Sequence, residues 1–169
     1  MNIIVKLVAQ NDFRQVNQFY LKALYEEHQS LISSEDMKKL LNKYQDDRWI
    51  TSWFKGYSTV FMVHDENNTV IGILTTEYFL NNNSVTINIT TLNNDNKKFI
   101  INTCIEKILH EYKTINEITT EVYEKNMHEL DLFKSLGFEI TDTSTAPAGD
   151  TTLKVHWTQK VYNKNLINI

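Results

Sequence analysis

Two lysines and three carboxylates are the side chains whose types and spacing could do chemistry in this chain. Lys97 and Lys98 open a segment with helical periodicity, where a cation is unfavourable unless an anion lies nearby. They therefore indicate a phosphate contact, with two solvated lysines as the alternative. Glu77, in an alternating segment, and the neighbours Glu26 and Glu27, near the end of a helical segment, are carboxylates that could accept a proton.

Nucleophilic and metal chemistry have less support. The single cysteine, Cys104, lies on the apolar side of a predicted helix and is interpreted as a small core residue. One cysteine also excludes an intrachain disulfide framework and a cysteine-cluster metal site. His28 follows two glutamates and is interpreted as a solvated helix end. The other histidines (His64, His110, His128 and His156) have no metal-ligand spacing, so no metal site is predicted.

The length and composition of the chain predict one folded domain that spans residues 1–169. The chain has 169 residues, of which 41% are hydrophobic and 22% are charged, as in ordinary globular proteins. Its net charge of −4 argues against nucleic acid as a partner. No apolar run approaches a membrane span, and the amino terminus lacks the pattern of a signal peptide. We therefore expect a cytoplasmic protein without a membrane partner.

Hydrophobic periodicity predicts how the first half of the chain is organised. Alternation over Ile3–Ala9 predicts a strand, and helical spacing from Phe13 predicts a helix. A second helix is predicted with Ser34 as its N-cap. The apolar stripe of Trp49, Trp53 and Phe54 continues this region. Three consecutive strands are then predicted at Thr59–Val63, Thr69–Phe79 and Ser84–Leu92.

The second half alternates helices and strands. A helix over Lys97–Tyr112 precedes a strand at Glu117–Tyr123, and Asn126 caps a short helix that ends at Gly137. Two terminal strands follow, at Phe138–Thr145 and Thr152–Val161. The order β-α-α-β-β-β-α-β-α-β-β predicts an α/β (α+β) domain with a mixed sheet and helices on both faces. The strands either side of the long helix should be parallel.

This order and one local motif resemble the GCN5-related N-acetyltransferase (GNAT) superfamily. The motif is the run from Asn126 to Phe138, which reads N-M-H-E-L-D-L-F-K-S-L-G-F and ends in Leu-Gly-Phe at 136–138. The hairpin around Gly72 looks like the family's second and third strands. The resemblance implies that acetyl-CoA, with no metal, lies between the strands Ser84–Leu92 and Glu117–Tyr123.

The same resemblance implies where the cofactor would be held. Main-chain groups near the end of one strand would pair with pantetheine, Asn126 would lie beside it, and the next helix would receive the pyrophosphate. Lys97, Ile100 and Asn102 match the family's phosphate-loop positions, and Ile100 and Asn102 replace small residues there. Ile100 facing the core is the alternative. The expected cofactor-binding residues are Thr91, Leu92, Asn93, Lys97, Lys98, Ile100, Asn102, Thr103, Asn126 and Phe133.

The family's catalytic residues are harder to assign in this sequence, because Phe133 occupies the position where the family often has a tyrosine that acts as the general acid. Tyr123 is a candidate substitute acid, with an ordinary strand tyrosine as the alternative. Glu77 is the candidate general base, and Glu26 and Glu27 are the other carboxylates considered. Trp49, Trp53 and Phe54 either line an acceptor pocket or, the favoured reading, pack a helix on the sheet.

The resemblance implies an enzyme that transfers an acetyl group from acetyl-CoA, or a related acyl-CoA, to the amine of a small molecule or peptide. The alternative is a catalytically impaired module that keeps the fold and binds a ligand or protein. A retained cleft with Lys97 at its mouth would favour the enzyme, and a cleft filled by Ile100 and Phe133 would favour the module. The sequence leaves the oligomeric state open; dimers are frequent in the family, and a homodimer could pair through an edge strand at Thr152–Tyr162.

Overall fold

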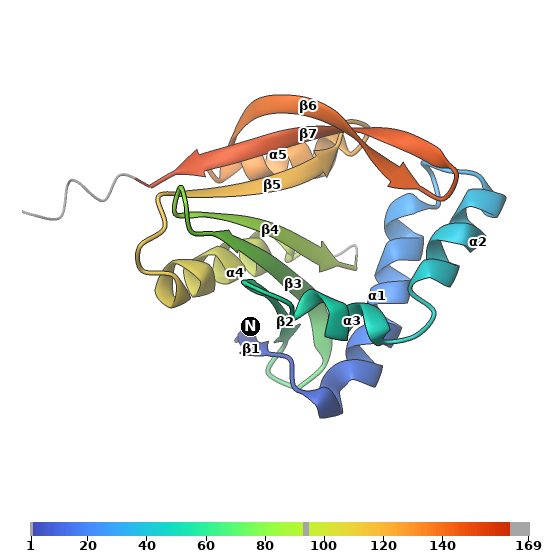
Figure 1. Cartoon of the computed structure of the whole chain (residues 1–169), viewed down its shortest axis with the longest axis horizontal. Helices are drawn as coiled ribbons and strands as arrows, with labels where there is room; N and C mark the ends of the chain where they lie inside the picture. Colours follow the sequence, from blue (N-terminus) through green and yellow to red (C-terminus); the bar gives the residue numbers. More distant parts are fainter. Residues whose placement is uncertain (1, 93–94, 163–169) are drawn as a thin grey trace, which may run out of the picture.

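The computed structural model describes residues 2–92 and 95–162, and a seven-stranded sheet organises them (Figure 1). Asn93, one of the predicted cofactor-binding residues, lies outside the described residues. The strand order is β1-β2-β3-β4-β5-β7-β6. The strands are β1 (Ile4–Leu7), β2 (Ser58–His64), β3 (Val70–Phe79), β4 (Ser84–Thr91), β5 (Glu117–Tyr123), β6 (Glu139–Ala148) and β7 (Thr151–Val161). The helices are η1 (Gln10–Asp12), α1 (Phe13–His28), α2 (Ser34–Lys43), α3 (Arg48–Trp53), α4 (Lys97–Glu111) and α5 (Met127–Ser135).

The predicted order of elements and the mixed sheet are confirmed, with two local differences. Residues around Trp49 form a separate short helix, α3, which the sequence analysis treats as a continuing stripe. The N-cap of α2 is Ser33, whereas Ser34 was predicted. Ser33 has an extended backbone, and its Oγ accepts a hydrogen bond from the Asp36 amide at 3.1 Å. Its side chain therefore satisfies one of the free amides of the first turn.

Both faces of the sheet carry apolar layers (Figure 1). On β4, Val85, Ile87 and Ile89 are buried on the face that α4 and α5 cover, together with Ile100 and Cys104 of α4. The opposite face packs on α1 and α3. Complete burial of one such aliphatic side chain stabilises the fold by about 1.5–3 kcal/mol. The helices are thereby fixed on the sheet, and their ends become rigid supports for a site.

The edge of the sheet on the carboxyl-terminal side is β6, and β7 is an interior strand. β7 pairs with β5 on one side and with β6 on the other. The expectation that Thr152–Tyr162 forms an edge available for dimer pairing is therefore wrong. The sequence places the two terminal strands correctly, but it does not reveal that β7 inserts between β5 and β6.

The parallel contact between β4 and β5 is short. Residues Ser84–Ile87 of β4 pair with Glu117–Thr120 of β5. Beyond these pairs the strands diverge, although β4 continues to pair with β3 and β5 continues to pair with β7. The sheet is therefore split at the carboxyl ends of its two central strands, where α/β folds commonly bind ligands.

Candidate active site

Two adjoining cavities occupy the space that the divergence of β4 and β5 opens. The α5-side cavity, of about 330 Å³, is lined by the end of α1, the end of β4 and the starts of α4 and α5. The α2-side cavity, of about 220 Å³, is lined by α1, α2, β4, β5, Phe133 of α5 and the end of β6. Four residues line both cavities and make them one cleft: Glu27, Ile89, Thr90 and Glu129.

A polar network joins the starts of α4 and α5 in the α5-side cavity. Lys97 Nζ lies 3.2 Å from Glu129 Oε1, with the two side chains 17% and 11% exposed. Asn126 Nδ2 donates to Glu129 Oε2 at 2.6 Å, and Asn126 Oδ1 accepts from the Glu129 amide at 3.3 Å. Asn126 and Glu129 thus form a reciprocal cap of α5. Lys97 compensates the buried carboxylate and places a cation at this cavity.

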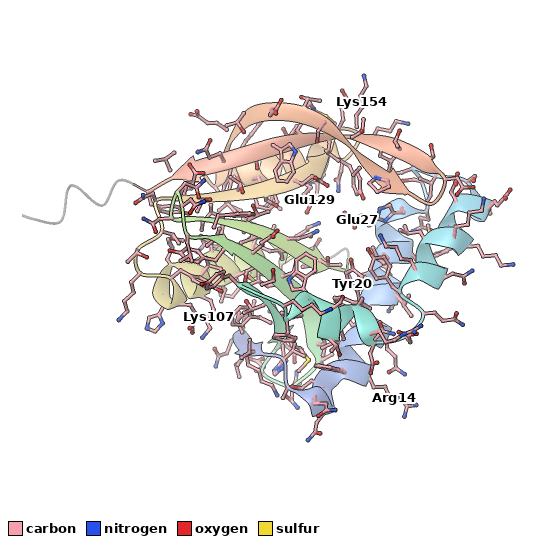
Figure 2. The ribbon with its side chains drawn as sticks, viewed as in Figure 1. Arg14, Tyr20, Glu27, Lys107, Glu129 and Lys154 are labelled. Atoms are coloured by element: carbon pink, nitrogen blue, oxygen red, sulfur yellow. The ribbon has the colours of Figure 1, made fainter. Side chains whose placement is uncertain are left out.

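Glu27 of α1 lines both cavities of the cleft, as Glu129 does, and Figure 2 labels the two side chains. The Glu27 side chain is 30% exposed. Burial raises the pKa of Glu27 to about 7, the Glu129 carboxylate adds to the rise, and the Lys97 ammonium opposes it. A carboxyl group with this pKa can take up and release a proton near neutral pH, as a general base must.

A partly buried hydrogen bond joins α1 to β5 in the α2-side cavity. His28 Nε2 lies 2.8 Å from the Tyr123 hydroxyl, and His28 Nδ1 lies 2.9 Å from the Leu24 carbonyl oxygen. The two rings meet edge to face, with centroids 5.1 Å apart. Burial lowers the pKa of His28 and, as the largest cause, raises the pKa of Tyr123 well above its usual range. Both groups are thereby held neutral at physiological pH.

The predicted cofactor residues divide between the cleft and α4. Thr91, Lys97 and Asn126 line the α5-side cavity, and Phe133 lines the α2-side cavity while packing edge to face on Phe138. The Thr91 hydroxyl is buried with no hydrogen-bond partner among the described residues. These residues therefore lie in one cleft, and their part in cofactor binding stays a prediction. Leu92 packs against the core on the α1 side of the sheet.

The remaining predicted residues lie within a helix, because α4 already begins at Lys97. The Ile100 amide donates to the Asn96 carbonyl, and the Ile100 side chain is 1% exposed in the core. The alternative that Ile100 faces the core is therefore confirmed. Asn102 donates to Glu106 and Thr103 donates to the Phe99 carbonyl, each within one helical turn. Lys98 is exposed at the start of the helix.

Glu26 also lines the α5-side cavity, whereas the other candidates lie outside the residues that line the cleft. Glu77 is exposed on β3 and pairs with Ser58 and Thr86, away from the end of β4 that opens onto the cleft. Trp49 and Trp53 donate to Asn17 Oδ1 and the Thr76 carbonyl, which supports the packing interpretation. Burial also raises the pKa of the Cys104 thiol to about 12, so the thiol is unreactive.

Glu129 and the His28–Tyr123 contact are features of the cleft that sequence reasoning missed, and the interpretation of His28 as a solvated helix end is wrong, because His28 is buried. The signal for Glu129 was its place three residues after Asn126, which is the spacing of a reciprocal helix cap. Nothing in the spacing of His28 and Tyr123, 95 residues apart, indicates their contact. Across residues 2–92 and 95–162, no cluster of three or more His, Cys, Asp or Glu side chains could hold a metal ion. None of the helices described there is long and apolar enough to cross a membrane.

Comparison with known proteins agrees with this architecture. Residues 5–146 match the sequence profile of the GNAT acetyltransferase domain, so the chain belongs to this family. A search of curated protein sequences finds no match.

Several solved structures share the fold. An N-acetyltransferase from Staphylococcus aureus is 18% identical with a TM-score of 0.73, and the match covers 95% of this chain and 98% of that one. A dodecameric spermidine N-acetyltransferase from Vibrio cholerae is 13% identical with a TM-score of 0.70, covering 98% and 96%. A ribosomal-protein-alanine N-acetyltransferase from Brucella melitensis is 15% identical with a TM-score of 0.66, covering 94% and 99%.

Proposed function

We propose that this chain transfers an acetyl group from acetyl-CoA to the amine of a small molecule or peptide. The observation that carries the proposal is the position of Glu27, a carboxyl group with a pKa of about 7 that faces both cavities of the cleft. The names of the similar structures support an amine acceptor, since one acts on spermidine and another on ribosomal-protein alanine. The retained cleft, with Lys97 in its lining, favours the enzyme over the impaired module.

The α5-side cavity has the polar groups that acetyl-CoA requires. The buried Thr91 hydroxyl has no partner in the described structure, and residues 88–91 of β4 have no described β5 partner on the side of the cleft. These groups would hold the pantetheine amides, and Lys97 with the first amides of α4 would face the phosphates. When bound, acetyl-CoA supplies an activated acyl carbonyl and a thiolate leaving group.

Glu27 performs the proton transfer in this proposal. Its carboxylate takes the proton that the acceptor ammonium must lose before the nitrogen lone pair can attack the acyl carbonyl. The carbon–sulfur bond then breaks and the thiolate leaves. Water takes the second proton from the acylated nitrogen, which gives the neutral amide, and protonates the thiolate. Glu27 suits this role better than Glu77, because Glu77 does not line the cleft.

The first test is thermal unfolding with acetyl-CoA, followed by assay of free thiol on adding a panel of small amines and peptides. A ligand at about 100 times its Kd stabilises the fold by about 2.7 kcal/mol, which raises Tm by roughly 5–10 °C for a domain of this size. Stabilisation followed by amine-dependent thiol release is the expected result. Absence of stabilisation at saturating acetyl-CoA would overturn the proposal and favour the impaired module.

A further inference from the structure

The contact between His28 and Tyr123 has a defined direction. The Leu24 carbonyl oxygen can only accept a hydrogen bond, so His28 Nδ1, 2.9 Å away, carries a hydrogen. The ring is buried, with the whole residue 2% exposed, and burial lowers its pKa, so the imidazole is neutral. A neutral ring with hydrogen on Nδ1 has none on Nε2. His28 Nε2 therefore accepts, and the Tyr123 hydroxyl donates, across their 2.8 Å contact.

This direction determines what Tyr123 can do in the cleft. A phenol has one hydrogen, and here that hydrogen is committed to His28. The lone pairs that remain on Tyr123 Oη can accept hydrogen bonds within the α2-side cavity, which Tyr123 lines. Tyr123 is thus arranged as an acceptor of hydrogen bonds. It is poorly arranged as the acid that the sequence analysis considered, because protonating a thiolate would first require breaking the bond to His28.

The surrounding charges select what such an acceptor would bind. Three carboxylates line the same cavity, those of Glu27, Glu121 and Glu129, and Lys97 compensates the charge of Glu129 from the neighbouring cavity. The basic residue in its lining is Lys43, whose Nζ lies 5.5 Å from the centroid of the Tyr44 ring. Tyr20 and Tyr44 also line the cavity, and the position of Lys43 over the Tyr44 ring shows that an aromatic face here can hold a cation. The balance of charge and the aromatic walls therefore both suit a cation.

We propose that the α2-side cavity binds the acceptor as a primary ammonium ion, which donates an N–H to the Tyr123 oxygen that His28 orients. The proposal rests on the proposed function and deepens it, since it names the protonation state of the acceptor and gives Tyr123 a role in binding. His28 is a positioning residue that acts through Tyr123. Glu27 then receives the proton that the bound ammonium releases.

A binding experiment without acetyl-CoA tests this inference. The probes are propylammonium chloride and tetramethylammonium chloride at matched ionic strength, and the readout is the rise in Tm with probe concentration. The two cations carry the same charge, but tetramethylammonium has no N–H to donate. We expect propylammonium to stabilise the wild-type chain more than tetramethylammonium does. Equal stabilisation by the two cations would overturn the proposal, whether or not the chain transfers acetyl groups.

Variants of Tyr123 and His28 test whether these two residues cause the stronger binding of propylammonium. Tyr123→Phe should weaken propylammonium binding about tenfold, as expected for one hydrogen bond to a charged group, and leave tetramethylammonium binding unchanged. His28→Leu should weaken it less, and His28→Gln, which retains an acceptor oxygen, should recover much of the loss. The double variant Tyr123→Phe/His28→Leu should match Tyr123→Phe alone, because His28 acts through Tyr123. His64→Leu, which removes another buried histidine that does not line the cleft, is the control.

Steady-state kinetics distinguishes ammonium binding from acid catalysis. If Tyr123 binds the acceptor, Tyr123→Phe raises KM for the amine and leaves kcat and KM for acetyl-CoA near the wild-type values. If Tyr123 protonates the leaving thiolate, the variant lowers kcat at an unchanged KM for the amine. That second result, or an additive double variant, would overturn the proposal.

Discussion

The two cavities of the cleft are built from different kinds of structure. The α5-side cavity is formed mainly by the ends of secondary-structure elements: the end of β4 and the first turns of α4 and α5, joined by Lys97, Asn126 and Glu129. The α2-side cavity is formed by side chains, including Tyr20, Tyr123 and other residues of α1, α2, β5 and β6. The first arrangement follows from the fold, whereas the second follows from this particular sequence.

This difference shows which properties can change independently. Backbone ends and helix termini offer amides whatever the side chains are, so the α5-side cavity keeps its chemistry while the sequence diverges. Ile100 illustrates this tolerance, because it occupies the core while α4 still begins beside the cleft. The α2-side cavity, where we propose that the acceptor binds, is lined mainly by side chains. Its selectivity therefore depends on individual side chains. Glu27 belongs to both cavities and links them.

The largest expected effect comes from removing the proton acceptor at the boundary of the two cavities. Glu27→Gln should lower kcat by about 10²–10³-fold, within the range of general-base catalysis. The Kd for acetyl-CoA should change little, because the amide keeps the size of the side chain. Steady-state kinetics and calorimetric titration measure the two quantities. Glu139→Gln, an exposed change on β6, is the matched control, and an unaltered kcat in Glu27→Gln would assign the base elsewhere.

The pH dependence of the reaction tests whether Glu27 is the general base. The pKa of Glu27 is about 7, and the carboxylate is the active form. The kcat should therefore rise about tenfold per pH unit below this pKa and level off above it.

Stability should follow the opposite trend. Because folding raises the pKa of Glu27, the protonated carboxyl stabilises the folded chain, and this contribution is lost as the pH rises through about 7. Wild type and Glu27→Gln should have similar Tm values near pH 4, and the variant should be a few degrees more stable near pH 9. Equal Tm values at both ends of this range would contradict a raised pKa.

A backbone position tests whether the acceptor side can be disturbed alone. Gly149, in the turn between β6 and β7, has φ of +68°, and a Cβ there would lie 2.6 Å from the Asp36 carbonyl oxygen on α2. Figure 1 shows this hairpin reaching α2, and the Asp150 amide donates to Asp36 Oδ1 at 2.8 Å. Gly149→Ala should destabilise the fold by about 3 kcal/mol and raise KM for the amine, with the Kd for acetyl-CoA unchanged.

The control for that variant is Gly56→Ala. Gly56 has a similar φ of +71° but no atom within 4 Å of the added methyl group. Gly56→Ala should therefore lose only the free energy that backbone strain costs, about 1 kcal/mol. The KM for the amine and the Kd for acetyl-CoA should not change. Chemical denaturation measures both free energies of unfolding. Equal losses in the two variants would mean that α2 yields to the hairpin without cost.

The smallest expected effect is that of Lys97, in the α5-side cavity, on the pKa of Glu27. Lys97 lowers the pKa of Glu27, so Lys97→Met should move the rising limb of the pH–rate profile upward, by less than about one unit. The variant should also weaken acetyl-CoA binding if Lys97 faces the phosphates. A profile that stays in place while acetyl-CoA affinity falls would show that the two cavities are electrostatically independent. Lys98→Met, at the exposed neighbouring position, is the control.

The sequence predicts the fold well because its signals are local. Alternation of Val85, Ile87 and Ile89 identifies β4, and Asn126 identifies the start of α5. Boundaries are less certain, since Ser33 and Ser34 are chemically identical and only the backbone conformation decides which one caps α2.

The candidate site is less predictable because it depends on convergence in space. Glu77 and Glu27 are equivalent in the sequence as glutamates near the ends of predicted elements. They differ because Glu77 faces solvent on β3, whereas Glu27 projects into the space that the divergence of β4 and β5 leaves beside Glu129. Residues about a hundred positions apart come together there, and no local pattern encodes their distance.

The four-residue parallel ladder between β4 and β5 also has a consequence for folding and local opening. It joins an antiparallel half, β1 to β4, to a second antiparallel half formed by β5, β7 and β6. The hairpins β2–β3, β3–β4 and β6–β7 join strands that are consecutive in the chain, whereas the ladder between the two halves requires closure of the chain through α4. Hydrogen exchange at Ser84–Ile87 should therefore report the separation of the two halves, a motion that leaves every antiparallel ladder intact. The short ladder that creates the cleft is therefore also the connection along which the two walls of the cleft can separate.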